Sequence, residues 1–341
     1  MAAAARARPV RARSAAGPLA PGGAPGALAA GGDDDEDGFA ADATGAIRQH
    51  FDEQGYAVVQ ALLPAALCAG VRAAFAAEVK PYEGPLYRQT SAHAERHLLS
   101  DRGYVLNPLL NVQSLDQRRF PRFRAAGLEL LTHPRLHAVA AAILGAPGTV
   151  VQSMYFEGNA ATWAHQDVYY LDAAPPGRMT GLWIALEDIA AGAGRFYVYP
   201  GSHRIALGQN RGELDFAFHH ERYKQRVREA IAARGLVCRA PALRQGDVLF
   251  FAARTIHGSH PTTAPQHARN SMTAHLITTG AGLLQFQRRT KPLATVRIHG
   301  VPVHLPKNQN VWAPRAMLWL ESTFPRTLRL AKKVAIKALL R

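Results

Sequence analysis

The second half of the chain is divided into short stretches of strand-forming sequence separated by turn-forming sequence. Each stretch is rich in Val, Ile, Leu, Phe, Tyr or Thr, and Gly, Pro or Asp residues stand between neighbouring stretches. Many short strands with this punctuation favour an all-β sandwich or jelly roll. The strands predicted in this way are 149–156, 180–189, 195–199, 237–242, 248–252 and 270–279.

Helical periodicity is concentrated before these strands, so helices are expected to pack on one outer face of the β core. The predicted elements are a helix at 47–51, a strand at 56–63, and helices at 64–79, 128–144 and 221–234. The last helix lies in an insertion, 204–235. The long irregular stretch 80–125 either lines a binding cleft or forms a solvated surface loop.

The two ends of the chain differ from the middle in composition. Residues 1–42 are rich in Ala, Gly and Pro, which predicts a disordered extension. Residues 286–341 form a basic extension: from Arg288 onward there are twelve Lys and Arg residues against one acid, Glu321, a net +11 of the chain's +15. The last part, Arg326–Arg341, reads as a basic amphipathic helix. It either contacts an anionic membrane surface or packs on the core.

Several classes of protein are disfavoured by what the sequence lacks. No run of 18 apolar residues is present, so no transmembrane helix is predicted. The two cysteines, Cys68 and Cys238, suggest neither a disulfide scaffold nor a thiolate metal cluster. The basic residues have no interleaved aromatics and no nucleic-acid-binding motif. We therefore expect a cytoplasmic protein, either free or peripheral to a membrane, with no nucleic acid and no obligate protein partner.

A possible metal site begins at His165-Gln166-Asp167. Side chains alternate along a strand, so a histidine and a carboxylate two residues apart point to the same side. Together with one distant histidine they would form a 2-His-1-carboxylate facial triad, which holds Fe(II) and leaves positions open. His257, which follows the buried strand 248–252 and precedes Gly258, is the predicted third ligand, and His260 is the competitor.

A candidate anion clamp lies on the last predicted strand. Arg269, Ser271, Thr273 and His275 share one face, whereas Asn270, Met272, Ala274 and Leu276 share the other. A polar face pointing into the barrel is unusual for a purely structural strand. A buried arginine requires an anionic partner, and its planar fork suits a carboxylate. If the co-substrate is 2-oxoglutarate, Arg269 could grip its distal carboxylate.

Each of these residues also has an ordinary structural interpretation. His165 and Asp167 could be a hydrogen-bonded pair, and His257 a satisfied core histidine. Two other functions remain open on the same features. One is a metal-dependent hydrolase or isomerase on a cupin-like barrel, and the other is a non-catalytic membrane-surface binding protein that uses Arg326–Arg341.

The order and spacing of several motifs resemble the phytanoyl-CoA dioxygenase family, over roughly residues 46–280. The motifs are Gln54-Gly55-Tyr56, His165-Gln166-Asp167, Trp183, Pro200-Gly201-Ser202-His203, His257-Gly258-Ser259 and Arg269. The resemblance implies a double-stranded β-helix (jelly roll, cupin-like) core, with residues 43–285 forming an Fe(II)/2-oxoglutarate dioxygenase domain. It implies that iron is held by His165, Asp167 and His257, and that 2-oxoglutarate is held by Arg269 with help from Trp183, Ser259 and Gln152.

The activity implied by the resemblance is hydroxylation of an unactivated C–H bond, with O₂ consumed and 2-oxoglutarate converted to succinate and CO₂. A Gly or Ala at the position of Asp167 would open a halide site, so the carboxylate favours hydroxylation over halogenation. The expected substrate is a small organic or lipid-like molecule, selected by residues 80–125 and 204–235. The fold alone does not say which molecule it is.

Overall fold

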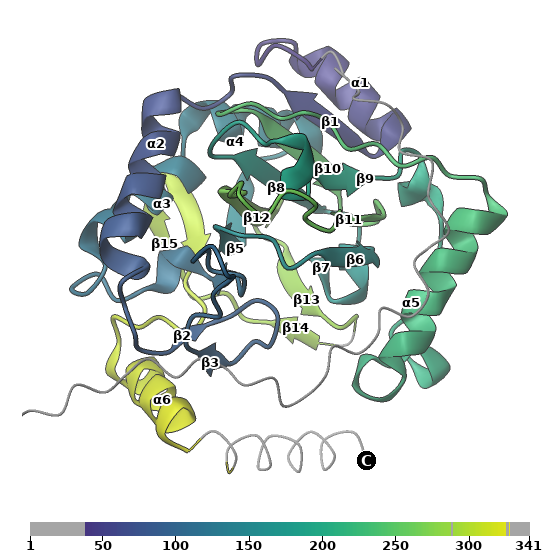
Figure 1. Ribbon diagram of the computed structural model, residues 1–341. Helices are drawn as coiled ribbons and strands as arrows, with labels where there is room; N and C mark the ends of the chain where they lie inside the picture. Colours follow the sequence, from purple (N-terminus) through teal and green to yellow (C-terminus); the bar gives the residue numbers. More distant parts are fainter. Residues whose placement is uncertain (1–37, 288, 325–326, 328–341) are drawn as a thin grey trace, which may run out of the picture. The chain divides into compact units, whose positions relative to one another are not determined.

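The computed structural model describes residues 38–287, 289–324 and 327, and shows a predominantly β protein with flanking helices (Figure 1). The main sheet has the strand order β1-β10-β8-β12-β5-β16-β15, and β4 also pairs with β5. Two three-stranded sheets, β6-β11-β9 and β14-β13-β7, and the hairpin β2-β3 complete the strand set of the described residues. The predicted jelly-roll core with helices around it is confirmed.

The strands have the following bounds: β1 Tyr56–Val59, β2 Leu86–Tyr87, β3 Ala94–Glu95, β4 Leu109–Leu110, β5 Gly148–Phe156, β6 Thr162–His165, β7 Leu171–Ala174, β8 Met179–Ala185, β9 Phe196–Val198, β10 Val248–Ala252, β11 His257–Ser259, β12 Ser271–Thr278, β13 Gly282–Gln285, β14 Arg289–Lys291, β15 Thr295–Ile298 and β16 Val301–His304. The helices are α1 Thr44–Gln54, α2 Ala65–Ala74 with the π-turn Phe75–Val79, α3 Pro121–Leu131, α4 Pro134–Leu144, α5 Phe216–Ala233 and α6 Trp312–Thr323.

Helices α1 to α4 pack on the outer face of the main sheet because their apolar residues match the outward side of β12. Met272, Ala274 and Leu276 belong to the same buried core as the apolar faces of these helices. Pro121 and Pro134 stand at the first turns of α3 and α4, where a missing N–H costs nothing. Burial of this outer face leaves the opposite, polar side of β12 turned toward the inside of the barrel.

Most of the predicted elements are present, and one predicted strand is wrong. The stretch 237–242 forms only a single bridge, between Arg239 and Val198. Pro241 has no N–H to continue a ladder there. The predicted helix at 128–144 is two helices, α3 and α4, and α5 starts earlier than predicted, with a kink at His219.

The C-terminal part of the chain joins the sheets, so the expected boundary at residue 285 falls inside the β13–β14 hairpin. Strand β16 pairs in parallel with β5 through Val303 and Val150, and β15 extends the sheet beyond it. Val303 is fully buried in the outer core. Near the other expected boundary, Phe39 already pairs with Val59. Residues 1–37 and almost all of Arg326–Arg341 lie outside the described residues, so neither the extension nor the terminal helix can be compared with its prediction.

No helix in the described part of the chain is long and apolar enough to cross a membrane.

Candidate functional site

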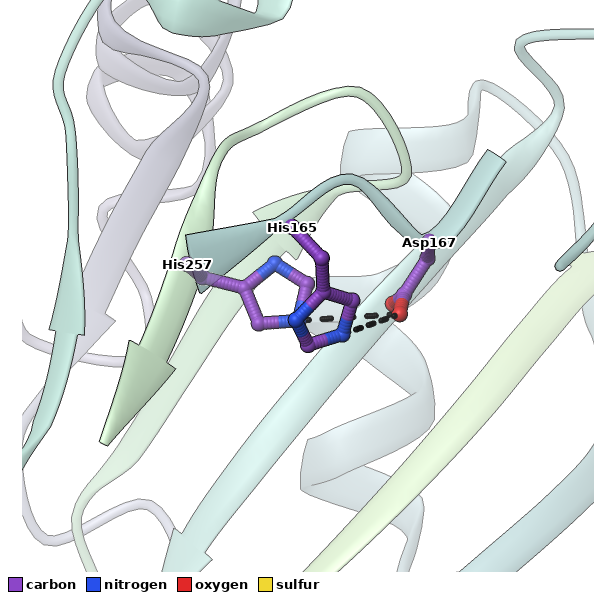
Figure 2. Close-up of side chains that lie close together, drawn as sticks. All are labelled: His165, Asp167 and His257. Carbon is purple, nitrogen blue, oxygen red and sulfur yellow. Dashed lines mark ion pairs between the residues drawn. The ribbon is translucent and has the colours of Figure 1, made fainter. Parts of the chain in front are cut away.

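Two histidines face each other across a pair of short strands. Strand β11 runs antiparallel to β6 and pairs His257 with His165, and the two imidazole rings are 4.4 Å apart (Figure 2). Gly258 permits this approach, because a Cβ atom there would lie 2.5 Å from the carbonyl oxygen of Thr162. Both rings therefore converge on one point on the inner side of the barrel.

Asp167 completes the group, although not in the way the sequence predicts. Strand β6 ends at His165, and Asp167 is the first residue of a 3₁₀ turn, Asp167–Tyr169. Gln166 between them keeps an extended conformation, so the alternation of side chains continues past the end of the strand. Asp167 Oδ1 lies 3.5 Å from His165 Nε2 and 3.6 Å from His257 Nε2 (Figure 2).

The hydrogen bonds of the two imidazoles leave their Nε2 atoms available to a metal. His165 Nδ1 donates to the carbonyl oxygen of Trp163 at 2.8 Å, and His257 Nδ1 donates to that of Thr255 at 2.9 Å. A proton on Nδ1 leaves the lone pair on Nε2, which is how second partners orient metal-bound histidines. One ligand atom from each of His165, Asp167 and His257 lies within 4.8 Å of the others, so this buried group could hold a metal ion.

The electrostatics of the group match the protonation states that metal binding needs. Burial acts to raise the pKa of Asp167, but the surrounding His257, His275 and His165 outweigh it and hold that pKa well below its usual range. Burial lowers the pKa of His257 to about 4. The group therefore offers a carboxylate and a neutral imidazole at neutral pH, which are the forms that coordinate a metal.

Arg269, the predicted clamp, is a buried cation that lacks an acidic partner. Its side chain is 2% exposed, and among the residues that the structure describes no carboxylate forms an ion pair with it. It donates one bond, from Nη1 to the carbonyl oxygen of Gly194 at 3.1 Å, and it lies over the rings of Phe156 and Trp183. Burial lowers its pKa to about 9. A buried guanidinium without an acidic partner would be stabilised by binding an anion.

Three buried polar atoms along the inner face of β12 and its approach have no hydrogen-bond partner within the described part of the protein. They are Nε of Arg269, Oγ of Ser271 and Nδ1 of His275. Buried polar groups are normally satisfied, and a cluster of exceptions on one face indicates a ligand that binds there. The orphaned Arg269 Nε in particular fits a carboxylate such as that of 2-oxoglutarate.

Trp183 and Phe196 connect the arginine to the triad. Trp183, on β8, is 2% exposed and lies beneath the Arg269 guanidinium at 5.9 Å. Phe196, on β9, stacks on Trp183 at 5.8 Å and contacts His257 at 5.4 Å. The sequence pattern identifies Trp183 as a site residue, but it places Phe196 only within the predicted strand 195–199. The two rings make a buried apolar floor between the clamp and the metal group.

Two other predicted pocket residues lie close to the site. Ser259 is on β11, but its hydroxyl donates to Asn159 Oδ1 at 3.1 Å and accepts from the backbone N–H of Thr162 at 2.9 Å. Those bonds hold the loop before β6. Gln152 is paired with His275 across β5 and β12 and is half-buried. The roles of Ser259 and Gln152 toward a co-substrate stay predictions.

The open side of the triad carries aromatic side chains. Trp163 and Tyr170 are half-buried and lie 5.3 Å and 5.7 Å from the ring of His165. The Tyr170 hydroxyl is 2.8 Å from His220 Nε2 on α5, and the more exposed Phe216 packs on both Tyr170 and His220. A surface cavity of about 570 Å³ has none of these residues in its lining and is bounded instead by residues of α1, the end of α4, His203 and the segments 176–180 and 252–254.

A jelly-roll core with two histidines and one carboxylate around a common point defines a class of cupin-like metal-site proteins. The profile of the phytanoyl-CoA dioxygenase (PhyH) family matches residues 51–271, and the chain belongs to this family, as its motifs indicate.

Curated relatives agree over shorter stretches. Phytanoyl-CoA dioxygenase 1 of Oryza sativa subsp. japonica is 30% identical over 136 residues, which are 38% of this chain and 45% of that protein. Phytanoyl-CoA dioxygenase domain-containing protein 1 of Bos taurus is 48% identical over 60 residues, 16% of this chain and 20% of that protein. The matched stretches thus span less than half of each relative.

Solved structures share the fold. The non-heme alpha ketoglutarate dependent epimerase SnoN from nogalamycin biosynthesis aligns with a TM-score of 0.53 at 19% identity, over 78% of this chain and 99% of that one. The carbocyclase SnoK from the same biosynthesis aligns with a TM-score of 0.52 at 20% identity, over 70% of this chain and 85% of that one. At this level of identity the likeness concerns the fold.

Proposed function

We propose that the chain is an Fe(II)- and 2-oxoglutarate-dependent oxygenase that hydroxylates an unactivated C–H bond of a small organic or lipid-like substrate. The observation that carries the proposal is the convergence of His165, Asp167 and His257 beside an arginine, Arg269, that has no acidic partner. A metal-dependent hydrolase or isomerase would use the triad but would have no need of that arginine.

In this proposal the two Nε2 atoms and Asp167 Oδ1 hold the metal. His275 donates to Oδ2 at 2.9 Å, so the carboxylate is oriented to present Oδ1. The carbonyl oxygens of Trp163 and Thr255 fix the imidazole tautomers. With only three protein ligands, a bound metal would keep coordination positions for small molecules.

Arg269 would bind the distal carboxylate of 2-oxoglutarate through its fork, with Trp183 and Phe196 excluding water from the clamp. Iron and 2-oxoglutarate, when bound, supply the oxidising chemistry, in which O₂ delivers one oxygen atom to the substrate and one to the succinate that forms with CO₂. The fold relative SnoN has been solved in complex with Fe3+ and alpha ketoglutarate.

The substrate would approach from the side of Trp163 and Tyr170. Aromatic rings there suit an apolar or ring-bearing molecule, and the Tyr170–His220 pair offers polar atoms that can orient it. The proposal specifies hydroxylation because Asp167 occupies the position at which a halogenating enzyme would need a smaller residue.

An anaerobic titration tests the cofactor assignment. Adding Fe(II) and then 2-oxoglutarate to the purified protein should produce a weak visible charge-transfer band, and His257→Ala should not produce it. A wild-type protein that demonstrably binds metal but shows no band would instead be the hydrolase or isomerase. Succinate release, screened over acyl-CoAs, free lipids and small metabolites, then identifies the substrate.

A further inference from the structure

The inner side of strand β5 is reached by solvent at two points. Three side chains of β5 share the inner face with the polar residues of β12, because directly opposed residues of antiparallel strands lie on the same side. They are Gln152 opposite His275, Met154 opposite Thr273, and Phe156 opposite Ser271. Gln152 and Phe156 are half-buried, whereas every other residue of β5 is buried. Solvent therefore enters the barrel along this strand, and a ligand can do the same.

A β-bulge lies next to Gln152. The ladder between β12 and β5 shifts register after the pair of His275 and Gln152, so Val151 is the extra residue. Bulges bend a strand and redirect its side chains, and they are common beside active sites. Val151 joins a buried apolar cluster inside the barrel that also contains Met179. Along β5, Gln152 therefore lies between that apolar cluster and Met154, at the level of His275.

Gln152 and His275 present polar atoms that the described part of the chain does not use. The Gln152 amide has no hydrogen-bond partner among the described residues. His275 Nδ1 is buried and equally without a partner there, while Nε2 donates to Asp167 Oδ2 at 2.9 Å. With the proton on Nε2, Nδ1 presents a lone pair and needs a donor. An amide that can both donate and accept thus stands beside an unfilled acceptor, and that acceptor belongs to the residue bonded to the metal group.

Apolar side chains continue from this polar pair along the strand. Met154 is two residues after Gln152 and shares its face. It belongs to a cluster formed by Tyr87, Leu110 and Met154, with Phe156 and Leu318 packed against them. A molecule that lies along the inner side of β5 would therefore meet hydrogen-bonding atoms near the metal group and apolar surface beyond them.

We propose that Gln152 and His275 form a substrate-contact pair that selects a molecule with an O–H or N–H donor beside an apolar body. This inference rests on the proposed oxygenase function and names the substrate class of the same site. The substrate's donor would bond to His275 Nδ1, and the Gln152 amide would bond to the oxygen of the same polar group. A plain hydrocarbon chain would leave both residues unpaired, and sites built to hydrogen-bond a substrate reject such analogues. The family resemblance assigns Gln152 to 2-oxoglutarate instead, and the experiment separates the two roles.

Two matched probes test the pair on the full-length protein. Hexanamide carries N–H donors on an apolar chain, and N,N-dimethylhexanamide has the same chain without them. We expect hexanamide to bind about tenfold more tightly to the anaerobic complex with Fe(II) and 2-oxoglutarate. Gln152→Leu, which keeps the volume but not the amide, should weaken hexanamide binding by about tenfold and narrow the difference between the probes. Isothermal titration measures these dissociation constants without turnover.

Further measurements separate substrate contact from co-substrate binding and from folding. Gln152→Leu should keep the Kd values for Fe(II) and 2-oxoglutarate, and its Tm should equal or exceed that of the wild type, because an unbonded amide gives way to an apolar group. Gln152→Ala provides a second reading with a smaller side chain. Gln225→Leu makes the same replacement at an exposed position of α5, where the amide is 2.9 Å from Glu229, and should leave hexanamide binding unchanged.

Three results would overturn the proposal. The first is a wild-type complex that binds both probes equally or binds neither. The second is a Gln152→Leu variant whose Kd for 2-oxoglutarate rises while hexanamide binding is unaltered, which would return Gln152 to the co-substrate. The third is a variant with a lowered Tm and unaltered hexanamide binding, which would make the amide a part of the fold. Failure of the proposed function is a different result: the wild type would bind metal without a charge-transfer band, and the probes, titrated without 2-oxoglutarate, would still report on the pair.

Discussion

His275 Nε2 lies 2.9 Å from Asp167 Oδ2, on the far side of the carboxylate from the two triad histidines. The bond joins β12 of the main sheet to the turn after β6, so it ties the metal group to the opposite sheet of the jelly roll. The two carboxylate oxygens therefore have different partners. Oδ2 accepts a hydrogen bond from His275, and Oδ1 is directed toward His165 and His257. In the proposed metal site, His275 would thus position Asp167 without itself being a ligand.

Replacement of His275 should weaken metal binding while the triad stays intact. Without its donor the carboxylate can rotate, and Oδ2 is left buried and unsatisfied, so we expect His275→Ala to lower metal affinity by about 10- to 100-fold. Anaerobic Fe(II) titration against a chromogenic chelator measures this. His275→Gln, which keeps a donor, should recover part of the loss.

His137→Ala is the matched control for this experiment. His137 is a half-buried histidine on α4, bonded to the carbonyl oxygen of Leu131, and it is not part of the triad. Its loss should change stability but not metal affinity. If His275→Ala and His137→Ala had the same effect, His275 would be a packing residue only.

Arg269→Ala should separate co-substrate binding from metal binding. Truncating one partner of a buried charge pair costs about 2–4 kcal/mol, so the Kd for 2-oxoglutarate should rise by roughly 30- to 1,000-fold with the Fe(II) affinity retained. Isothermal titration of each ligand gives both values. Arg269→Lys should remain impaired, because an ammonium cannot reproduce the planar fork.

The stability of the protein without 2-oxoglutarate provides an independent check on Arg269. A buried cation with no acidic partner destabilises the fold, and replacing such a group by an apolar one is often stabilising by about 1–4 kcal/mol. Arg269→Met should therefore raise the Tm of the ligand-free protein and abolish any further rise on adding 2-oxoglutarate. A lowered Tm would show that the arginine serves the fold.

Local periodicity accounts for the part of the site that the sequence predicts. Strand β10 has the predicted bounds, and the alternation along β12 correctly separates the polar inner face, with His275, from the apolar outer face. The order and spacing of the motifs predict that His165 and His257 belong to one site. These features are short-range patterns, so they are visible without knowledge of the fold.

The features that the sequence did not reveal depend on distant contacts. The bond between His275 and Asp167 joins residues 108 positions apart, and no pattern in either segment announces it. Strand β16 has the sequence Val-Pro-Val-His. It is short and contains a proline, so the sequence does not predict it as a strand, yet it pairs with β5 in the main sheet. Phe196 acquires its role only because β9 lies beside β11.

The stability of the metal-free protein should fall as the solution becomes mildly acidic. His257 has a folded-state pKa of about 4, against 6.5 when unfolded, so the unfolded chain binds the proton more readily. Its contribution is complete above pH 6.5 and is lost as pH falls toward 4, by roughly 3 kcal/mol. Urea melts in EDTA across this range measure the slope, and His257→Asn should flatten it. An equal slope in the variant would assign the effect to other groups.

Phe216 should contribute to substrate binding but not to the metal or co-substrate sites. It is 38% exposed at the rim beside Tyr170 and stacks on Phe286 at 5.0 Å. Phe216→Ser should raise KM for the substrate found by the succinate screen by about tenfold, as expected for one lost aromatic contact. The Kd values for Fe(II) and 2-oxoglutarate should be unchanged. Phe218→Ser serves as the exposed control, and an equal KM in both variants would remove the rim from the substrate site.

Truncation should show that the catalytic fold extends well past residue 285. A chain ending there loses β16, whose Val303 is fully buried, and Leu305, which is 9% exposed in the same core. Burying two such side chains contributes about 3–6 kcal/mol, so the Tm should fall by roughly 5–10 °C or the chain should fail to fold. A chain ending at Phe324 keeps both residues and should melt near the wild type.

Point variants give the same test without removing sequence. Val303→Ala should destabilise the protein by about 1–2 kcal/mol, because it removes two buried methyl groups and leaves a cavity. Val296→Ala on the neighbouring β15, where the side chain is 43% exposed, should be near neutral. If Val303→Ala and Val296→Ala had the same Tm, and the 1–285 chain had the Tm of the wild type, then β16 would be an accessory to the sheet and the fold would end at β13.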